Sequence, residues 1–289
     1  MTEARLPFNL SPESPIGIFD SGVGGLSVWR EIARQLPHES TLYVADQGHV
    51  PYGIRSLAEV REYAKGITRF LLAQGAKIIV VACNTASGAA LRTLRDSFPG
   101  LAFVGMEPAV KPAAENTQSG VIAVIATQAT FQGELFHSLV ERFATGVRLE
   151  TQFCPGLVDL VERGELDTPE TEATLRECLN PLLQAGADHL VLGCTHYPFL
   201  AETIIRITGP NVTLVDPAPA VARQTARVLE HQSLCAPANV GTKHTFFTSG
   251  SPEVLRGLAH RLVGFEGTIQ PVVWRGNDLQ TIKGENDVE

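Results

Sequence analysis

The sequence lacks three features that would place it in a specialised class of protein. Its longest apolar runs, such as Ile78–Cys83, are far too short to cross a bilayer, so we expect no membrane span. Residues 1–14 contain no basic start followed by an apolar core, so we expect no secretory signal. The net charge is −8 and no basic patch accompanies it, which argues against direct binding of nucleic acid.

Cysteine is sparse and irregularly placed. The five cysteines form no C-x-x-C pair, which predicts free thiols in a reducing cytoplasm instead of a disulfide framework or a structural zinc site. We expect Cys154, Cys178 and Cys235 to be small apolar packing residues. We predict no metal site.

Short apolar segments alternate with helical patterns along the whole chain, which predicts parallel sheets covered on both faces. The pattern restarts near residue 108, so we expect an α/β protein with two similar, doubly wound domains. Residues 1–14 and 276–289 are expected to be a disordered leader and tail. The main strands are expected at 16–19, 41–45, 77–82, 101–105, 120–126, 147–153, 212–215, 245–248 and 268–273, with one more before Cys194, and a helix at 130–143.

Polar side chains follow the expected strands at their carboxyl ends. Ligands of open α/β sheets bind beyond these ends, so this set is a candidate active site. Its members are Asp20, Ser21, Asp46, Cys83, Asn84, Thr85, Glu107, Thr127, Cys194, Thr195, His196 and Asp216.

Two segments of the chain resemble each other. QGAKIIVVACNTASG, at 74–88, and AGADHLVLGCTHYPFL, at 185–200, both contain Gly-Ala, a charged residue, an apolar strand and then a cysteine with a polar pair. The offset from Gly75 to Gly186 equals that from Cys83 to Cys194. We expect both thiols to lie where a strand meets a helix N-terminus, which should lower their pKa.

The matched thiols indicate proton transfer. A single nucleophilic cysteine would suit acyl transfer, but it would leave the second copy unexplained. A metal site would need more soft ligands than Cys194 and His196. Removing a proton from one face of a carbon and returning one to the other face needs a base and an acid on opposite sides. The duplication therefore favours a racemase or epimerase with its active site in a cleft between the domains.

Six segments, in order, resemble those of bacterial glutamate racemases, which share a superfamily with aspartate and hydantoin racemases. They are IGIFDSGVGGLSV, YVADQGHVPYG, VACNTASG, VGMEPAV, IATQATFQGELF and LVLGCTHYPFL, within residues 15–265. Aspartate racemases typically carry an acidic residue where His196 follows the second Cys-Thr, so the resemblance points to glutamate. The segment QGHV, at 47–50, departs from the family pattern.

The resemblance implies roles for particular residues. Cys83 would take the α-proton of D-glutamate and Cys194 that of L-glutamate, with Asp20 supporting the first thiol and His196 the second. Glu162 would lie near the second thiol. The implied substrate-binding residues are Asp20, Ser21, Tyr52, Gly53, Asn84, Thr85, Thr127, Thr195 and His196, with Thr130 as a further contact.

The resemblance also implies a biological setting. It predicts a cytoplasmic enzyme, often a homodimer, that makes D-glutamate for peptidoglycan without pyridoxal phosphate, nucleotide or metal. One domain would comprise 15–107 and 217–275, and the other 108–216. Other hypotheses are a racemase of aspartate or a hydantoin, a regulatory protein on the same scaffold that interacts with DNA gyrase, and a hydrolase that uses only Cys194 and His196.

Simpler interpretations remain open for several residues. Asp20 and the following glycines form a tight turn that could merely cap a helix. The glycines also resemble a dinucleotide-binding loop, but Ser27 breaks that pattern. Tyr52-Gly53 could be a plain turn, His196 a capping residue, and Glu162 an exposed helix charge.

Overall fold

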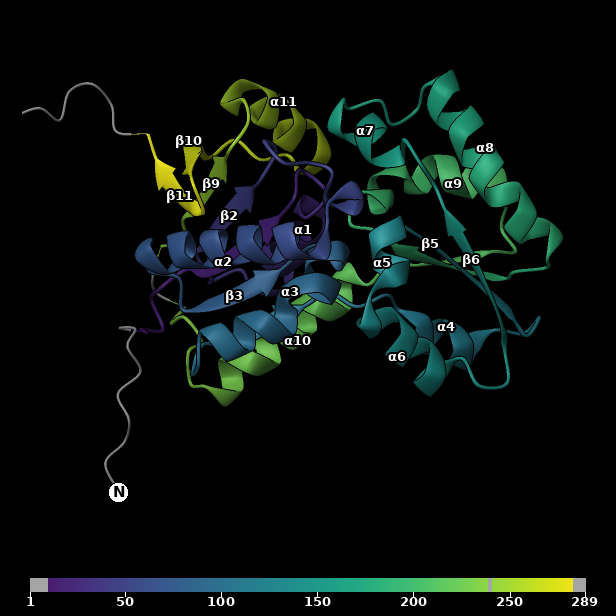
Figure 1. The fold of residues 1–289 in the computed structure, drawn as a ribbon, viewed down its shortest axis with the longest axis horizontal. Helices are drawn as coiled ribbons and strands as arrows, with labels where there is room; N and C mark the ends of the chain where they lie inside the picture. Colours follow the sequence, from purple (N-terminus) through teal and green to yellow (C-terminus); the bar gives the residue numbers. More distant parts are fainter. Residues whose placement is uncertain (1–9, 239–240, 283–289) are drawn as a thin grey trace, which may run out of the picture.

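The computed structural model describes residues 10–238 and 241–282, whose strands form two sheets (Figure 1). The first sheet has the order β11-β10-β9-β2-β1-β3-β4, and the second has the order β6-β5-β7-β8. Every ladder is parallel except the hairpin of β10 with β11. The strands are β1 (Ile16–Asp20), β2 (Thr41–Ala45), β3 (Ile78–Val81), β4 (Phe103–Gly105), β5 (Val121–Ala126), β6 (Arg148–Phe153), β7 (His189–Gly193), β8 (Thr213–Val215), β9 (His244–Thr248), β10 (Thr268–Arg275) and β11 (Asp278–Thr281).

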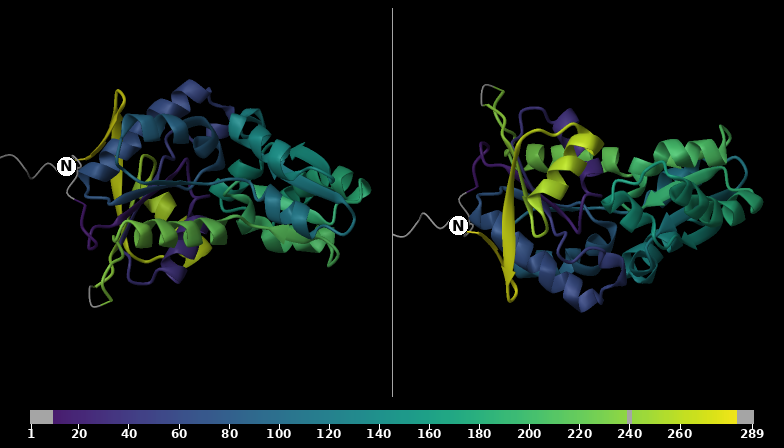
Figure 2. Two further views of the ribbon diagram at one scale, coloured as in Figure 1. Left: turned by 90° about the horizontal axis from the view of Figure 1, so that it is seen from below. Right: turned by 90° about the horizontal axis from the view of Figure 1, so that it is seen from above.

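Helices cover the sheets, and the two domains lie side by side along the long axis of the molecule (Figures 1 and 2). The predicted fold class, α/β with two domains of parallel sheet, is confirmed. None of the described helices is long and apolar enough to span a membrane. The helices are α1 (Leu26–Gln35), η1 (Tyr52–Ile54), α2 (Leu57–Ala73), α3 (Asn84–Ser97), α4 (Val110–Asn116), α5 (Gln128–Gln132), α6 (Glu134–Phe143), α7 (Leu157–Glu162), α8 (Pro169–Gln184), η2 (Tyr197–Leu200), α9 (Ala201–Thr208), α10 (Ala218–His231) and α11 (Pro252–Val263).

In each sheet the strand order reverses at one strand, and a thiol follows the strand next to it. In the first sheet β1 lies between β2 and β3, and in the second β5 lies between β6 and β7. The strands that come next in the chain are therefore added on opposite sides of β1, and likewise of β5. The point where the order reverses is the switch point, at which open sheets bind ligands. Cys83 follows β3 and Cys194 follows β7, so each thiol lies at such a point.

The structure corrects several details of the expected elements. The helix expected at 130–143 is two helices, because Gly133 adopts an extended conformation between α5 and α6. The tail is not disordered over Asp278–Thr281, which form β11 with Leu279 buried. The polar sequence hides this strand because its other side chains face solvent. Residues 283–289 lie outside the described part of the chain.

The prediction of free, purely packing cysteines is also wrong in part. Cys154, at the end of β6, and Cys178, in α8, are joined in a disulfide with their Cα atoms 5.7 Å apart. The packing of α8 against β6 brings the two together, and sequence spacing cannot show that. Cys235 is free but exposed, so it is not a packing residue.

The charged residue of each repeat, Lys77 or Asp188, anchors a loop. The buried Lys77 ammonium donates to the carbonyl oxygens of Pro12, at 2.6 Å, and Leu234, at 2.8 Å, and pairs with Glu39. The leader is therefore ordered at Pro12, contrary to expectation, while residues 1–9 lie outside the described part. The Asp188 carboxylate accepts the Thr117 hydroxyl, at 2.6 Å. It also accepts the backbone N–H groups of Gln118 and Ser119.

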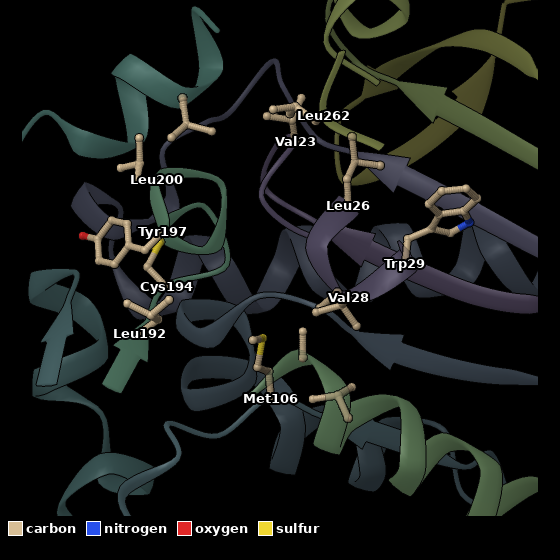
Figure 3. Close-up of a cluster of buried hydrophobic side chains, with 14 of the residues drawn as sticks. Val23, Leu26, Val28, Trp29, Met106, Leu192, Cys194, Tyr197, Leu200 and Leu262 are labelled. Carbon is tan, nitrogen blue, oxygen red and sulfur yellow. The ribbon is translucent and has the colours of Figure 1, made fainter. Parts of the chain in front are cut away.

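A single buried apolar cluster extends through both domains (Figure 3). It includes Val23 and Leu26, after β1, together with Leu192, Tyr197 and Leu200 around the end of β7. The segments that follow the central strands of the two sheets thus pack against each other. This contact fixes how the two thiol-bearing strand ends face one another.

Replacing Lys77 by Met should destabilise the fold by about 3 kcal/mol, because it leaves Glu39 buried without its partner. Urea denaturation would measure the free energy of unfolding. The control is Lys65→Met, which removes a partly exposed pair with Glu62 on α2 and should cost less than about 1 kcal/mol. Equal losses for the two variants would contradict the anchoring role of Lys77.

Candidate active site

A small cavity lies at the carboxyl ends of the central strands of both sheets. The cavity is lined by Ser21, Pro51, Tyr52, Gly53, Cys83, Asn84, Thr85, Thr127, Thr130, Val158, Gly193, Cys194, Thr195 and His196. Most of the candidate residues from the sequence therefore gather in one place, but five of them do not line this cavity: Asp20, Asp46, Glu107, Glu162 and Asp216. Glu107 lines a different pocket. Sequence reasoning missed Pro51, Val158 and Gly193, which carry no reactive group.

Cys83 is buried at the N-cap of α3, where its sulfur accepts the backbone N–H of Ala86 at 3.5 Å. Burial, followed by the negative charge of the neighbouring Asp20, raises the pKa of the Cys83 thiol well above its ordinary value. The hydrogen bond from Ala86 acts in the opposite direction and is outweighed. The expectation that the helix N-terminus would lower this pKa is therefore wrong, because that expectation omitted desolvation and Asp20.

Asp20 is fully buried and connects the two thiol regions. Its carboxylate accepts the backbone N–H of Gly25 in its own domain and the Thr195 hydroxyl of the other, at 3.2 Å. Burial raises the pKa of Asp20, although its hydrogen bonds and His196 partly offset this. Asp20 therefore lies beside Cys83 and also holds Thr195, the residue next to Cys194.

Cys194, His196 and Glu162 form a chain of contacts. The Cys194 sulfur lies 3.7 Å from His196 Nδ1, and His196 Nε2 lies 2.7 Å from Glu162 Oε1. Burial alone would lower the pKa of His196, but its bonds to Cys194 and Glu162 raise it well above the ordinary value. A charged imidazole is a donor at both nitrogens, so a protonated His196 ring would donate both to the Cys194 sulfur and to the Glu162 carboxylate.

The glycines in the turn after β1 leave room for Glu162 and His196. A side-chain carbon at Gly22 would overlap the Glu162 carboxylate, and one at Gly24 would overlap the His196 ring. Glu162 also accepts the backbone N–H of Val23, at 2.7 Å. The turn is therefore more than a helix cap: it receives a histidine and a carboxylate from the other domain.

Hydroxyl groups line the opposite side of the cavity. The Thr127 oxygen lies 3.0 Å from that of Thr85 and 2.9 Å from that of Thr130, so these hydroxyls form a cluster across the two domains. Tyr52 lines the cavity, but its hydroxyl donates to Asp46, at 2.6 Å, behind the wall. Gly53 packs directly against the side chain of Thr127.

Asn84 presents an unpaired amide to the cavity. It is 4% exposed and lines the cavity, yet neither its amide nitrogen nor its amide oxygen has a partner among the described residues. Buried amides are normally hydrogen-bonded, because an unpaired one costs free energy. A ligand with both donor and acceptor groups would satisfy it.

Fold and cavity together define a class: a two-domain α/β protein with one buried thiol from each domain at a shared cavity. The model of the Asp/Glu/Hydantoin racemase family matches residues 16–225. A glutamate racemase of Roseiflexus sp. (strain RS-1) is 51% identical over 249 residues, which cover 86% of this chain and 92% of the relative.

Solved structures of glutamate racemases are also similar to this chain. The glutamate racemase isoform RacE1 of Bacillus anthracis aligns with a TM-score of 0.81 and 35% identity, over 90% of this chain and 98% of that chain. The Escherichia coli glutamate racemase, solved with L-glutamate and the activator UDP-MurNAc-ala, aligns with a TM-score of 0.80 and 35% identity, over 91% of this chain and 100% of that one. The chain belongs to the Asp/Glu/Hydantoin racemase family and is an isomerase.

Replacing Glu162 by Gln should lower the pKa of His196. Without the carboxylate, burial disfavours the charged ring, so the ring should lose its proton at a lower pH than in the wild type. An NMR titration of the labelled histidine rings would measure this, with His196 assigned from the His196→Asn spectrum. His260, exposed and far along the chain in α11, serves as an internal control. An unchanged His196 titration would contradict the proposed pairing.

Proposed function

We propose that this protein racemises glutamate, with Cys83 and Cys194 as the two proton-transfer groups. The observation that carries the proposal is the placement of one buried, free thiol from each domain at a single cavity. Two groups on opposite sides of a bound carbon can remove a proton from one face and supply a proton to the other.

The reaction needs one thiolate and one thiol. For L-glutamate, Cys194 as thiolate takes the α-proton and Cys83 as thiol gives its proton to the opposite face, leaving Cys194 as thiol and Cys83 as thiolate. For D-glutamate the two exchange roles. The raised pKa of Cys83 favours its thiol form, and the His196 ring lies beside the Cys194 sulfur, where a protonated ring would stabilise a thiolate.

The cavity offers suitable groups for glutamate. The unpartnered Asn84 amide can accept from the substrate ammonium and donate to a carboxylate. The hydroxyls of Thr85 and Thr127 can donate to carboxylate oxygens. The hydroxyls of Ser21 and Thr195 donate to Asp20 and can accept from the substrate ammonium. The bound L-glutamate of the Escherichia coli relative supports this choice of substrate.

The wider setting belongs to the proposal as well. We propose a cytoplasmic homodimer that supplies D-glutamate for peptidoglycan, acting through its own side chains without a cofactor. We assign residues 15–107 and 217–281 to one domain and 108–216 to the other, a division supported by the membership of the two sheets. The expected end at 275 moves to 281 because β11 belongs to the first sheet.

Changing either thiol should stop racemisation. Cys83→Ser and Cys194→Ser should each lower kcat by about a thousandfold or more, because a serine hydroxyl is a far weaker acid and base than a thiol. Polarimetry with L-glutamate and with D-glutamate would measure this. Cys235→Ser, at an exposed free cysteine, is the matched control and should be fully active.

Other outcomes identify the alternatives. Loss of activity with Cys194→Ser but not with Cys83→Ser would contradict the two-thiol mechanism and indicate a hydrolase-like site. Racemisation of aspartate or a hydantoin in place of glutamate would keep the mechanism and change the substrate. No reaction with any of these substrates would favour a regulatory protein on this scaffold.

A further inference from the structure

Gln47 lies directly after β2, in the segment that departs from the family pattern. Its amide nitrogen donates to Glu162 Oε2, at 3.0 Å, and its amide oxygen accepts the Thr248 hydroxyl, at 2.9 Å. Gln47 does not line the cavity. Gln47 is nevertheless the third part of the first domain that contacts Glu162, after the backbone of Val23 and the glycine turn.

The direction of these hydrogen bonds follows from their partners. The Thr248 oxygen accepts the backbone N–H of Gly250, at 2.9 Å, so its own proton is free to go to the oxygen of Gln47. The amide nitrogen of Gln47 is then directed at Glu162. Hydrogen bonds from His196, Gln47 and Val23 hold the pKa of Glu162 below its ordinary value despite burial, so the carboxylate is an acceptor only.

The two oxygens of Glu162 have different partners. Oε1 receives the His196 ring and the backbone N–H of Val23, whereas Oε2 receives Gln47. The contact with Gln47 therefore fixes the rotation of the carboxylate about its own axis. That rotation determines whether Oε1 points at the His196 ring, and hence where the ring lies relative to Cys194.

We propose that Gln47 is a positioning residue: it holds the Glu162 carboxylate across the cleft, and through Glu162 and His196 it orients the donor that faces Cys194. Gln47 belongs to the first sheet's side of the cleft and Glu162 to α7 on the other. Separation of the domains would break this bond and the Val23 bond together. The orientation of the Glu162 carboxylate therefore depends on the contact between the two domains. The inference rests on the proposed racemase function.

The test is Gln47→Met, which keeps the side-chain length but removes the donor. It should lower kcat for glutamate about tenfold, because this loss corresponds to the usual contribution of one hydrogen bond to a charged group. KM should change less than about twofold. Because the enantiomers are equal in free energy in water, kcat/KM should fall equally in both directions. Gln47→Glu should cost more than Gln47→Met, since it places two carboxylates together.

A double-mutant cycle separates positioning from a merely structural role. In a Glu162→Gln background, Gln47→Met should cause less than about a twofold further loss, because the group through which Gln47 acts is already gone. The matched control is Gln35→Met, since Gln35 donates to Glu31 at 2.9 Å in the same domain but away from the cavity. It should leave kcat unchanged.

The outcomes that overturn the inference are distinct from failure of the proposed function. Full activity of Gln47→Met, or an equal loss in both backgrounds, would refute the positioning role while leaving the racemase intact. If the wild type does not racemise glutamate, the proposed function fails, but NMR can still test whether Gln47 positions the His196 ring. Gln47→Met should then shift the His196 ring signals and lower the pH at which they titrate. Unchanged signals would overturn it.

Discussion

The structure depends most on one contact across the cleft, the docking of the His196–Glu162 pair against the glycine turn that follows β1. The pair comes from the second domain, and the turn from the first. Only glycine at positions 22 and 24 leaves space for the carboxylate and the ring. The contact joins the domains and, at the same time, places the His196 ring beside the Cys194 sulfur.

The duplicated strands produce two thiols with similar positions and different chemistry. Each cysteine follows a central strand at a switch point of its sheet. Cys83 lies beside the buried Asp20, which opposes negative charge on its sulfur, whereas Cys194 lies beside a charged histidine, which favours it. A two-base racemase needs one acid and one base at any moment. The two cysteines have similar positions but different neighbours, Asp20 for Cys83 and His196 for Cys194, and this difference meets the need.

Much of this arrangement could be predicted from the sequence, because strand ends of parallel sheets converge and the polar residues there are visible as a pattern. The cavity contains Cys83, Asn84, Cys194 and His196 for that reason. Features that depend on neighbours distant in the chain could not be predicted. They include the raised pKa of Cys83, the disulfide of Cys154, and the β11 hairpin, whose single buried Leu279 gives no alternating pattern.

The most direct test of two-thiol proton transfer is the fate of the α-hydrogen during the first turnovers of L-glutamate in D₂O. Chiral chromatography with mass spectrometry would separate the enantiomers and measure the deuterium in each. If Cys194 removes the proton and Cys83 supplies another, newly formed D-glutamate should carry one α-deuterium while the remaining L-glutamate keeps its hydrogen. D-glutamate that retains the original hydrogen, or deuterium that enters L-glutamate as fast as product forms, would show that a single group does both steps and would contradict the mechanism.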